Sequence, residues 1–377
     1  MGYQFRRQRK INMRILIVST IKRKVTPENF ASRSRVIFQL AKGLAEKGHQ
    51  VSLLGTGDSL IPGVKIIPVI EKGWVDLPPV ENEFLRQTAN LIQLSKKMVE
   101  IQDDFDIVHN HVYPDFFPSV YEDKLRIPLL TTFHALYDFY MDDLLSSFKK
   151  TYFISLSNRY QTLYKKTKFF KTVYNGVDTD FYAFQAKKTD YLFWLARLPK
   201  ARNKDGSFMD PKGVRWAIKL AQETGEKLFI SAPVEDREFF EKDVKPYLND
   251  KIQFVGQSTN EQSVPKEKII ELFQNAKAFL MTINQHEPFG LVMVEAGSCG
   301  TPVIGFDRGS IPEVIVDGKT GFVVPYEEGV DGLKNALSKI NQIKPQDCRD
   351  HIVNTFSIKK MVENYERTYQ EILSQKK

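Results

Sequence analysis

Two glutamates stand close together in the last third of the chain. The stretch 286–306 reads HEPFGLVMVEAGSCGTPVIGF and holds Glu287 and Glu295, with seven residues between them. Proline is tolerated in the first turn of a helix but not in its interior, so we expect a helix that begins near Pro288–Gly290. Glu287 would then lie at the start of this helix and Glu295 within it.

The start of such a helix is suited to binding an anion. Its first N–H groups have no partner inside the helix and carry a partial positive charge. A glycine at position 290 would let a phosphate approach closely. A diphosphate bound there would leave a sugar beside Glu287 and a ribose near Glu295, and carboxylates accept hydrogen bonds from ribose hydroxyls in other dinucleotide folds. The pair therefore favours a nucleoside-diphosphate-sugar site, and the alternative is an amphipathic helix with unrelated acids.

Short apolar runs alternate with helical patterns along the whole chain. In the first series we expect strands at 14–20, 51–57, 64–70, 106–111, 128–135, 151–157 and 171–177, and helices at 34–47 and 81–100. A second series starts with a strand at 191–198 and continues with strands at 227–233, 251–257 and 278–284 and helices at 212–224 and 269–276. This alternation is typical of parallel sheets that are covered on both faces. We therefore predict an α/β protein of two doubly wound domains with a cleft between them.

The two series set the expected domain boundaries. Residues 1–12 form a basic tail that need not be native, and residues 13–184 form an N-terminal domain. Residues 185–355 form a C-terminal domain. The remaining 356–377 form a helix whose apolar residues recur at three- and four-residue steps. We expect this helix to pack back on the N-terminal domain.

Composition excludes several classes of protein. No apolar run is long enough to span a membrane, and two cysteines make neither a disulfide framework nor a metal-binding spacing. The net charge of +8 arises mostly within the first fifty residues, where a basic surface could attract anionic lipid or phosphorylated substrates. We expect a cytoplasmic protein that binds no nucleic acid, and we leave open a peripheral contact with the inner membrane face.

The stretch that begins at Glu287, EPFGLVMVEAGSCGTPVIG, resembles the donor-binding motif of retaining glycosyltransferases of family 4, which have the GT-B fold. Their motif is usually E-P-F-G-L-x-x-x-E-A-x-A-x-G-x-P-V, and the following FDRGSIPEVIVDGKTGFVV is also similar to the family. The resemblance covers most of 190–325 and extends more loosely over the N-terminal half. It implies two Rossmann-like domains, of which 13–184 binds the acceptor and 185–355 binds the donor. It also implies the transfer of a hexosyl unit, with retention at the anomeric carbon, from a nucleotide sugar.

The resemblance also implies two cations on the donor diphosphate. Arg197 in LARL matches the first, and Lys212 in PKGV matches the second. Two cations would stabilise the charge of the leaving group without a metal. The insertion KARNKDGSFMD (200–210) separates them, so Lys200 and Lys204 remain alternatives to Lys212.

Further donor contacts follow from the same resemblance. Glu287 would bind hydroxyls of the donor sugar, Glu295 would bind the ribose, and Gly256 in FVGQ would lie where the base rests. Backbone N–H groups at the start of the helix would contact phosphate or sugar, and these belong to Phe289, Gly290 and Leu291. The catalytic set that we expect is His134, Glu287, Arg197 and Lys212.

In the N-terminal half, TFH (132–134) resembles the segment that carries the family's active-site histidine. His134 would lie near O6 of the sugar or near the acceptor, where a neutral imidazole can donate or accept a hydrogen bond. His109 and His111 in DIVHNH are expected to face opposite sides of a strand, with His109 structural and His111 a candidate site residue.

One segment departs from the family pattern. Family members usually carry a Gly-Gly loop after the first strand, whereas this chain has TPENFASRSRV (26–36). Ala31, Ser32 and Arg33 would form the acceptor or phosphate loop here. Arg33 and Arg35 would bind an anionic acceptor or the donor phosphate, or would be exposed helix arginines.

Several rival functions would show motifs of their own in the sequence. A metal-dependent transferase with a D-x-D motif would use DTD (178–180), which falls in the linker that we expect at 175–190 between the two series. A dehydrogenase would need G-x-G-x-x-G after a first strand, and the first strand of neither series is followed by it. The function that we expect is metal-independent transfer from a UDP-sugar, without a cofactor, in polysaccharide biosynthesis. The acceptor would be a glycan, a lipid-linked sugar or a small molecule. The alternative is a non-catalytic or epimerase-type nucleotide-sugar-binding protein of the same fold.

Overall fold

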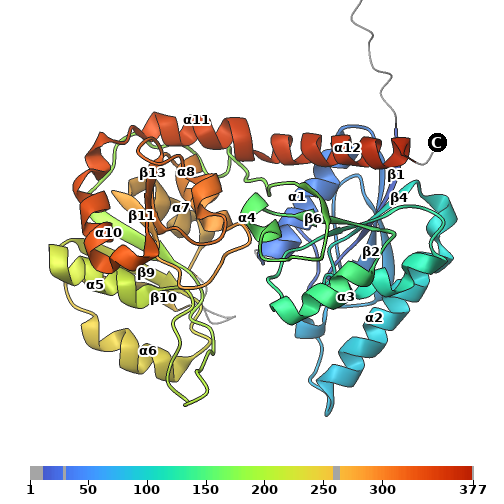
Figure 1. Ribbon diagram of the computed structural model, residues 1–377, viewed down its shortest axis with the longest axis horizontal. Coiled ribbons are helices and arrows are strands. Elements are labelled where there is room, and N and C mark those ends of the chain that lie inside the picture. Colours follow the sequence, from blue (N-terminus) through green and yellow to red (C-terminus); the bar gives the residue numbers. More distant parts are fainter. Residues whose placement is uncertain (1–11, 29–30, 258–263, 376–377) are drawn as a thin grey trace, which may run out of the picture. The chain divides into compact units, whose positions relative to one another are not determined.

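The chain folds into two compact units, each built on a parallel β-sheet, and Figure 1 shows a computed structural model of it. The structure describes residues 12–28, 31–257 and 264–375. Among these described residues, unit 1 comprises those that fall within 1–155, 164–173 and 362–377, and unit 2 comprises those within 156–163 and 174–361. The two α/β domains predicted from the sequence are therefore confirmed.

Within the described residues, unit 1 contains a seven-stranded sheet in the order β3-β2-β1-β4-β5-β6-β7, with every neighbouring pair parallel. The strands are β1 (Arg14–Val18), β2 (Gln50–Thr56), β3 (Lys65–Ile70), β4 (Ile107–Asn110), β5 (Leu129–Thr132), β6 (Thr151–Ser155) and β7 (Phe169–Thr172). β4 and β5 are buried throughout, as expected of central parallel strands. Their carboxyl ends carry the histidines singled out in the sequence.

Helices cover the sheet of unit 1. They are α1 (Ser32–Glu46), α2 (Glu83–Glu100), α3 (Asp142–Ser147) and the C-terminal α12 (Ile358–Ser374), with short 3-10 segments η1 (Trp74–Asp76), η2 (Gln102–Asp104), η3 (Phe117–Lys124) and η4 (Phe139–Met141). α12 buries Met361, Tyr365, Tyr369 and Ile372. These four residues follow the three- and four-residue steps that predicted one apolar stripe.

Unit 2 contains a six-stranded parallel sheet, again within the described residues, in the order β10-β9-β8-β11-β12-β13. Its strands are β8 (Tyr191–Leu195), β9 (Lys227–Ala232), β10 (Ile252–Gln257), β11 (Ala278–Met281), β12 (Val303–Phe306) and β13 (Gly321–Val324). The order reverses direction at β8 and β11, and ligands of open α/β sheets bind at such a switch point.

The helices of unit 2 are α4 (Asn158–Gln161), α5 (Val214–Thr224), α6 (Arg237–Asp243), α7 (Lys266–Asn275), α8 (Leu291–Ser298), α9 (Ile311–Val314), α10 (Gly329–Ser338) and α11 (Pro345–Phe356), with η5 (Lys245–Tyr247), η6 (Tyr326–Glu328) and η7 (Ile340–Gln342). Most of these helices lie between the strands along the chain, whereas α4 precedes β8 and α10 and α11 follow β13. The helix predicted to start near Pro288–Gly290 is α8. It ends before Gly300, whose φ of 78° is the left-handed stop expected there.

The boundaries of the two units differ from those of the predicted domains. The sequence placed the boundary after residue 184, whereas the compact units change over after residue 173, and residues 156–163 belong with unit 2. The predicted strand at 171–177 forms β7, which ends at Thr172. Residues 362–377, most of the helix that was expected to pack on the N-terminal domain, belong to unit 1.

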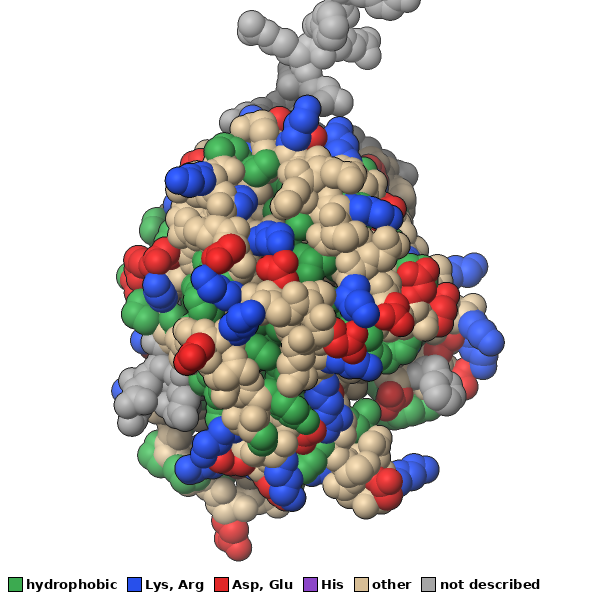
Figure 2. Space-filling view, turned by 90° about the vertical axis from the view of Figure 1, so that its left-hand side faces the viewer, with side chains coloured by type: hydrophobic (Ala, Val, Ile, Leu, Met, Phe, Trp, Pro, Cys, Tyr) green, Lys and Arg blue, Asp and Glu red, His purple; other side chains and the backbone are tan. Residues whose placement is uncertain are grey.

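The surface shown in Figure 2 carries basic and acidic side chains side by side over one face of the protein. Among the residues that the structure describes, no helix is both long enough and apolar enough to cross a bilayer. Cys299 and Cys348 are both buried as free thiols, and burial raises the pKa of each to about 12. Neither thiol is therefore poised to act as a nucleophile.

Candidate active site

Helix α8 begins at a glycine that no other residue could replace easily. Gly290 precedes the first helical residue, Leu291, and has a φ of 76°, in the left-handed region. A Cβ at this position would also lie 2.7 Å from the Sδ-bonded methyl carbon of Met293. The chain can therefore turn from the loop after β11 into α8 only with glycine here, which leaves the first N–H groups of α8 at a tight turn.

Glu287 and Lys212 form an ion pair in unit 2. The Nζ atom of Lys212 lies 2.6 Å from Oε2 of Glu287, and about a quarter of each side chain is exposed, 24% and 22%. The backbone carbonyl of Glu287 accepts a hydrogen bond from the N–H of Ser310. The structure thus brings together the carboxylate predicted for the donor sugar and a cation predicted for the donor phosphate.

The backbone that follows Lys212 is fixed by Asp210, the last residue of the insertion at 200–210. The carboxylate of Asp210 accepts hydrogen bonds from the N–H groups of Gly213, Val214 and Arg215 at the start of α5. Burial raises its pKa, and the three N–H donors act against that shift. The sequence analysis missed this residue, although an aspartate just before a helix start is a recognisable capping signal.

Arg197 occupies a different environment from Lys212. It follows β8, and its guanidinium forms an ion pair with Glu235 at 3.0 Å. Its side chain is 61% exposed, so the ion pair contributes little to stability. Arg197 can therefore exchange Glu235 for another anion at a small cost in free energy. The structure therefore leaves Arg197 accessible without placing it on the Lys212–Glu287 pair.

Glu295 and Phe289 are both buried, but their surroundings differ. Glu295 lies within α8 and is 3% exposed. The ring of Phe289 packs in the apolar core of unit 2 against Tyr174 and Phe356. Phe289 can therefore reach a ligand only through its backbone, and the predicted contact of Glu295 with a ribose stays a prediction.

Gly256 lies near the end of β10 and is covered by a neighbouring side chain. A Cβ on Gly256 would come within 1.7 Å of Cγ2 of Val264. Residues 258–263, between these two, lie outside the described part of the chain. The close packing explains why this position is a glycine, and the predicted contact with a base stays a prediction.

Two further arginines lie around His286, which precedes Glu287. The N–H of Gly309 donates a hydrogen bond to Nδ1 of His286 at 3.1 Å. Burial lowers the pKa of His286, and the positive charges of Arg308 and Arg159 lower it further. Arg308 stacks over the ring of Tyr326, and Arg159 is paired with Asp307. Sequence reasoning missed both arginines, because nothing in their spacing links them to Glu287.

The D-x-D letters at 178–180 have a local structural role. Oδ1 of Asp178 accepts hydrogen bonds from the N–H groups of Asp180 and Phe181. Aspartate side chains commonly fix turns in this way. Within the part of the chain that the structure describes, no group of three or more His, Cys, Asp or Glu side chains is arranged to hold a metal ion.

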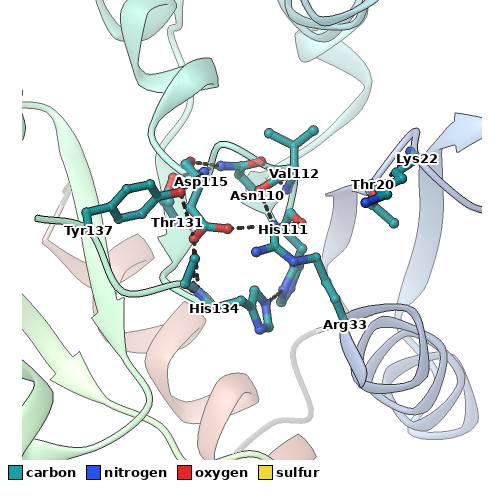
Figure 3. Close-up of polar contacts among 11 residues, drawn as sticks. Thr20, Lys22, Arg33, Asn110, His111, Val112, Asp115, Thr131, His134 and Tyr137 are labelled. Carbon is teal, nitrogen blue, oxygen red and sulfur yellow. Dashed lines mark hydrogen bonds and ion pairs between the residues drawn. The ribbon is translucent and has the colours of Figure 1, made fainter. Parts of the chain in front are cut away.

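A second cluster of functional groups lies in unit 1, at the ends of β4 and β5 (Figure 3). Nε2 of His134 lies 2.7 Å from Nδ1 of His111, and Nε2 of His111 lies 3.2 Å from Nδ1 of His109. The expectation that His109 and His111 face opposite sides of the strand was wrong, because residues two apart on a strand point to the same side. Their ring centroids are 3.9 Å apart.

The loop that carries His134 is fixed by a buried carboxylate, Asp115. Its Oδ2 atom accepts hydrogen bonds from the N–H groups of His134 and Ala135 and from the hydroxyl of Tyr137 (Figure 3). Burial raises the pKa of Asp115, and the charge of Arg33 and these hydrogen bonds oppose that shift. Asp115 therefore ties the loop after β5 to the loop after β4.

Arg33 supplies the counter-charge of Asp115. Its Nη1 atom lies 2.7 Å from Oδ1 of Asp115 and donates to the carbonyls of His111 and Val112. The side chain is 18% exposed, so it is not the exposed helix arginine that was one alternative. Ala31 precedes α1 and Ser32 begins it, and the phosphate-binding role predicted for these two residues and Arg33 stays a prediction.

All three histidines of this cluster favour the neutral form. Burial lowers the pKa of His109 and His134 well below the usual value, and it lowers the pKa of His111 to about 3. The nearby charge of Arg33 adds to the effect at His111 and His134. At physiological pH each ring therefore carries one N–H donor and one lone pair.

Comparisons with known proteins match both halves of the chain. The family model for glycosyl transferases group 1 matches residues 220–354, and the model for glycosyltransferase family 4 matches residues 34–181. The chain is 25% identical over 378 residues to N-acetyl-alpha-D-glucosaminyl L-malate synthase of Bacillus anthracis, which covers 89% of this chain and 92% of that protein. The first match contains Glu287 and Glu295, and the second contains His134.

Solved structures share the fold. The sucrose-phosphate synthase of Thermosynechococcus elongatus aligns with a TM-score of 0.72 at 16% identity, over 97% of this chain and 100% of that chain. HepE of Anabaena, in complex with UDP and glucose, aligns with a TM-score of 0.64 at 16% identity, over 96% of this chain and 100% of that chain. At such identities the likeness establishes the arrangement of strands and helices and leaves the substrates of this chain open.

Proposed function

This chain is a glycosyltransferase of family 4 with the GT-B fold, and we propose that it moves a hexosyl unit from a nucleotide sugar to a hydroxyl group with retention at the anomeric carbon. The observation that carries the proposal is the Lys212–Glu287 pair beside the start of α8. A cation and a set of helix N–H groups suit a diphosphate. A carboxylate beside them suits the hydroxyls of the sugar attached to it.

Unit 2 would bind the donor. The α- and β-phosphates would take the N–H groups at the start of α8 together with Lys212 and Arg197, and Glu295 would accept hydrogen bonds from the ribose. As the bond to the sugar breaks, negative charge grows on the departing phosphate, and fixed positive charge stabilises it. We propose that these cations do the work that a metal ion does in other transferases.

Unit 1 would supply His134 and the acceptor-binding loops. A neutral imidazole held by hydrogen bonds can contact a hydroxyl without bringing a competing charge. In the proposed course the acceptor oxygen attacks on the side from which the phosphate departs, and the phosphate oxygen takes the proton of the acceptor. Glu287 binds hydroxyls in this scheme and forms no covalent bond to the sugar.

We propose a nucleotide for the donor and a chemical class for the acceptor. UDP is the nucleotide that we propose, and it is also the one in the Anabaena structure of the same fold. The acceptor that we propose is a glycan or a lipid-linked sugar in polysaccharide biosynthesis, reached by a peripheral contact with the inner membrane face. Similarity to a malate-glycosylating synthase over most of the chain favours a small hydroxy acid as the second candidate.

The test is turnover of purified protein with UDP-, GDP- and ADP-sugars, with and without acceptors, in the presence of a chelator. We expect nucleotide release that depends on an acceptor, from one nucleotide class, and a product whose anomeric configuration matches the donor by NMR. Release of nucleotide without any acceptor would indicate the epimerase-type reaction instead. No release with any donor would indicate a non-catalytic binding protein, and loss of activity in chelator would overturn metal independence.

A further inference from the structure

His134 is one end of a hydrogen-bonded chain of side chains that crosses unit 1 to the C-terminal helix. Nε2 of His109, beyond His111, lies 2.8 Å from Oγ1 of Thr132, and that oxygen lies 2.9 Å from the hydroxyl of Tyr365 on α12. Behind His134, every member of the chain is fully buried. In order the members are His134, His111, His109, Thr132 and Tyr365.

A second tyrosine of α12 joins this chain from the side. The hydroxyl of Tyr369 lies 2.7 Å from Nδ1 of His109, the same atom that faces Nε2 of His111 at 3.2 Å. Nδ1 of His109 therefore lies within hydrogen-bond distance of two groups and must donate to both or accept from both. How it does so depends on whether this atom carries the proton of the neutral ring.

The chain has two polarities, because each neutral histidine has one N–H and one lone pair. In the first, each group donates toward His134: Tyr365 to Thr132, Thr132 to Nε2 of His109, Nδ1–H of His109 to His111, and Nδ1–H of His111 to Nε2 of His134. His134 then carries its proton on Nδ1. In the second polarity every donor points the other way, and His134 carries its proton on Nε2.

The two polarities differ in the number of buried hydrogen-bond donors that lack an acceptor. In the first, the single N–H at Nδ1 of His109 is shared between Tyr369 and His111, as three-centre hydrogen bonds allow, and only the hydroxyl proton of Tyr369 lacks an acceptor among the described residues. In the second, Tyr369 and His111 compete for one ring lone pair, and the buried hydroxyl proton of Tyr365 also lacks an acceptor among those residues. Buried donors without acceptors are costly, so the first polarity is favoured.

We propose that His109 is a positioning residue, which through His111 holds His134 in the neutral tautomer with its proton on Nδ1. In this tautomer Nδ1 of His134, the ring nitrogen that does not contact His111, carries the proton. Nδ1 can therefore donate a hydrogen bond but cannot accept a proton. The consequence for sugar transfer rests on the proposed function: His134 would donate to a substrate oxygen, and the acceptor would lose its proton to the departing phosphate. The tautomer itself can be measured without any substrate.

The first test is NMR of the full chain labelled with ¹⁵N in its histidines. Two-bond proton–nitrogen spectra distinguish the two neutral tautomers from each other and from the charged ring, and the signals of His134 are identified by their loss in His134→Gln. We expect His134 to be neutral with its proton on Nδ1 at about pH 7.5. A proton on Nε2, an even mixture of tautomers, or a charged ring would overturn the proposal.

Two substitutions of His109 test its part in this arrangement. His109→Asp places an acceptor-only group against His111, which we expect to reverse the tautomer of His134. His109→Leu removes the donor to His111, and we expect the signals of His134 to move toward the average of the two tautomers and transfer to fall by roughly threefold to tenfold, as for the loss of one hydrogen bond. Signals of His134 that stay as in wild type in both variants would show that His109 has no such role.

His49→Leu is the matched control. His49 is also buried in unit 1 and also contacts α12, through Glu366, but no hydrogen bond links it to His134 within the described residues. We expect its loss to leave the signals of His134 and the transfer rate unchanged, so a change here would mean that looser packing of α12 explains the effect. If wild type transfers no sugar, the proposed function fails, while the tautomer measurement still decides the role of His109.

Discussion

Lys212 and Glu287 lie 2.6 Å apart in unit 2, so the side chain proposed for the donor phosphate is paired with the one proposed for the donor sugar. Lys212 lies just before α5 and Glu287 lies in the loop before α8, and 75 positions separate them. A bound nucleotide sugar would exchange this contact for two others. The diphosphate would take Lys212, and the hydroxyls of the sugar would take Glu287.

This exchange predicts opposite effects for the two partners on nucleotide binding. Lys212→Met should weaken binding of a nucleoside diphosphate by about 1.5–3 kcal/mol, the usual worth of a charged hydrogen bond. Glu287→Gln should bind it at least as tightly as wild type, because Lys212 is then free, while turnover falls on the order of a hundredfold. Titration calorimetry and kcat measurements check both, and nucleotide binding weakened by Glu287→Gln would contradict the assignment.

Asp115→Asn should loosen the loop that carries His134. The variant keeps the shape but removes the charge opposite Arg33, and breaking a mostly buried ion pair costs about 3 kcal/mol. We expect a lower denaturant midpoint and a lower kcat with unchanged nucleotide affinity. Asp123→Asn is the control, since Asp123 is an exposed residue of unit 1 that pairs with Lys150. Equal losses of stability and kcat in the two variants would mean that Asp115 does not hold the loop of His134.

Stability should fall as the pH drops below about 6.5. His109, His111 and His134 have lowered pKa values in the folded chain, so the unfolded state binds protons there that the folded state does not. Each histidine contributes up to about 1.4 kcal/mol per pH unit over that range. The raised pKa of Asp115 acts in the opposite sense, because its stabilising effect is present at low pH and is lost as the pH rises.

Urea unfolding at several pH values between about 7.5 and 4.5 measures this dependence. His109→Asn removes one of the three groups, so its stability should fall less steeply with acid than that of wild type. A free energy of unfolding that stays constant over this range would show that the histidines are not held neutral.

Gly309→Ala should disturb Glu287 through the backbone. A Cβ at Gly309 would lie 2.3 Å from the carbonyl oxygen of Glu287, and the residue has a φ of 52°. Gly318→Ala is the matched control, because Gly318 also has a positive φ, of 69°, but its Cβ would meet nothing within 4 Å. We expect Gly309→Ala to lose roughly 1–3 kcal/mol more stability than the control, as overpacking does, and to lose turnover. Equal effects would place the cost in the φ angle alone.

The sequence predicted those features of the fold that depend on neighbouring residues in the chain. Pro288, Gly290 and Gly300 fixed the limits of α8 through their own backbone preferences, and the spacing of apolar residues fixed the buried face of α12. The contacts that build the candidate site are not local. His109 meets Tyr369 across 260 positions, and neither periodicity nor a turn signal carries such information. The family resemblance singled out His134 and Glu287, whereas the contacts of Asp115 with the loop after β5 and of Tyr365 with Thr132 appear only once the chain is folded.

The central claim is that α8 and its carboxylates form a nucleotide-sugar site, and binding of UDP, GDP and ADP by calorimetry, without added metal, tests it most directly. We predict selective binding of one nucleotide, UDP, which Glu295→Gln weakens by about 1.5–3 kcal/mol. Glu271→Gln, on the exposed side of α7, should bind as wild type does. No binding of any nucleotide, or full affinity in Glu295→Gln, would contradict the account.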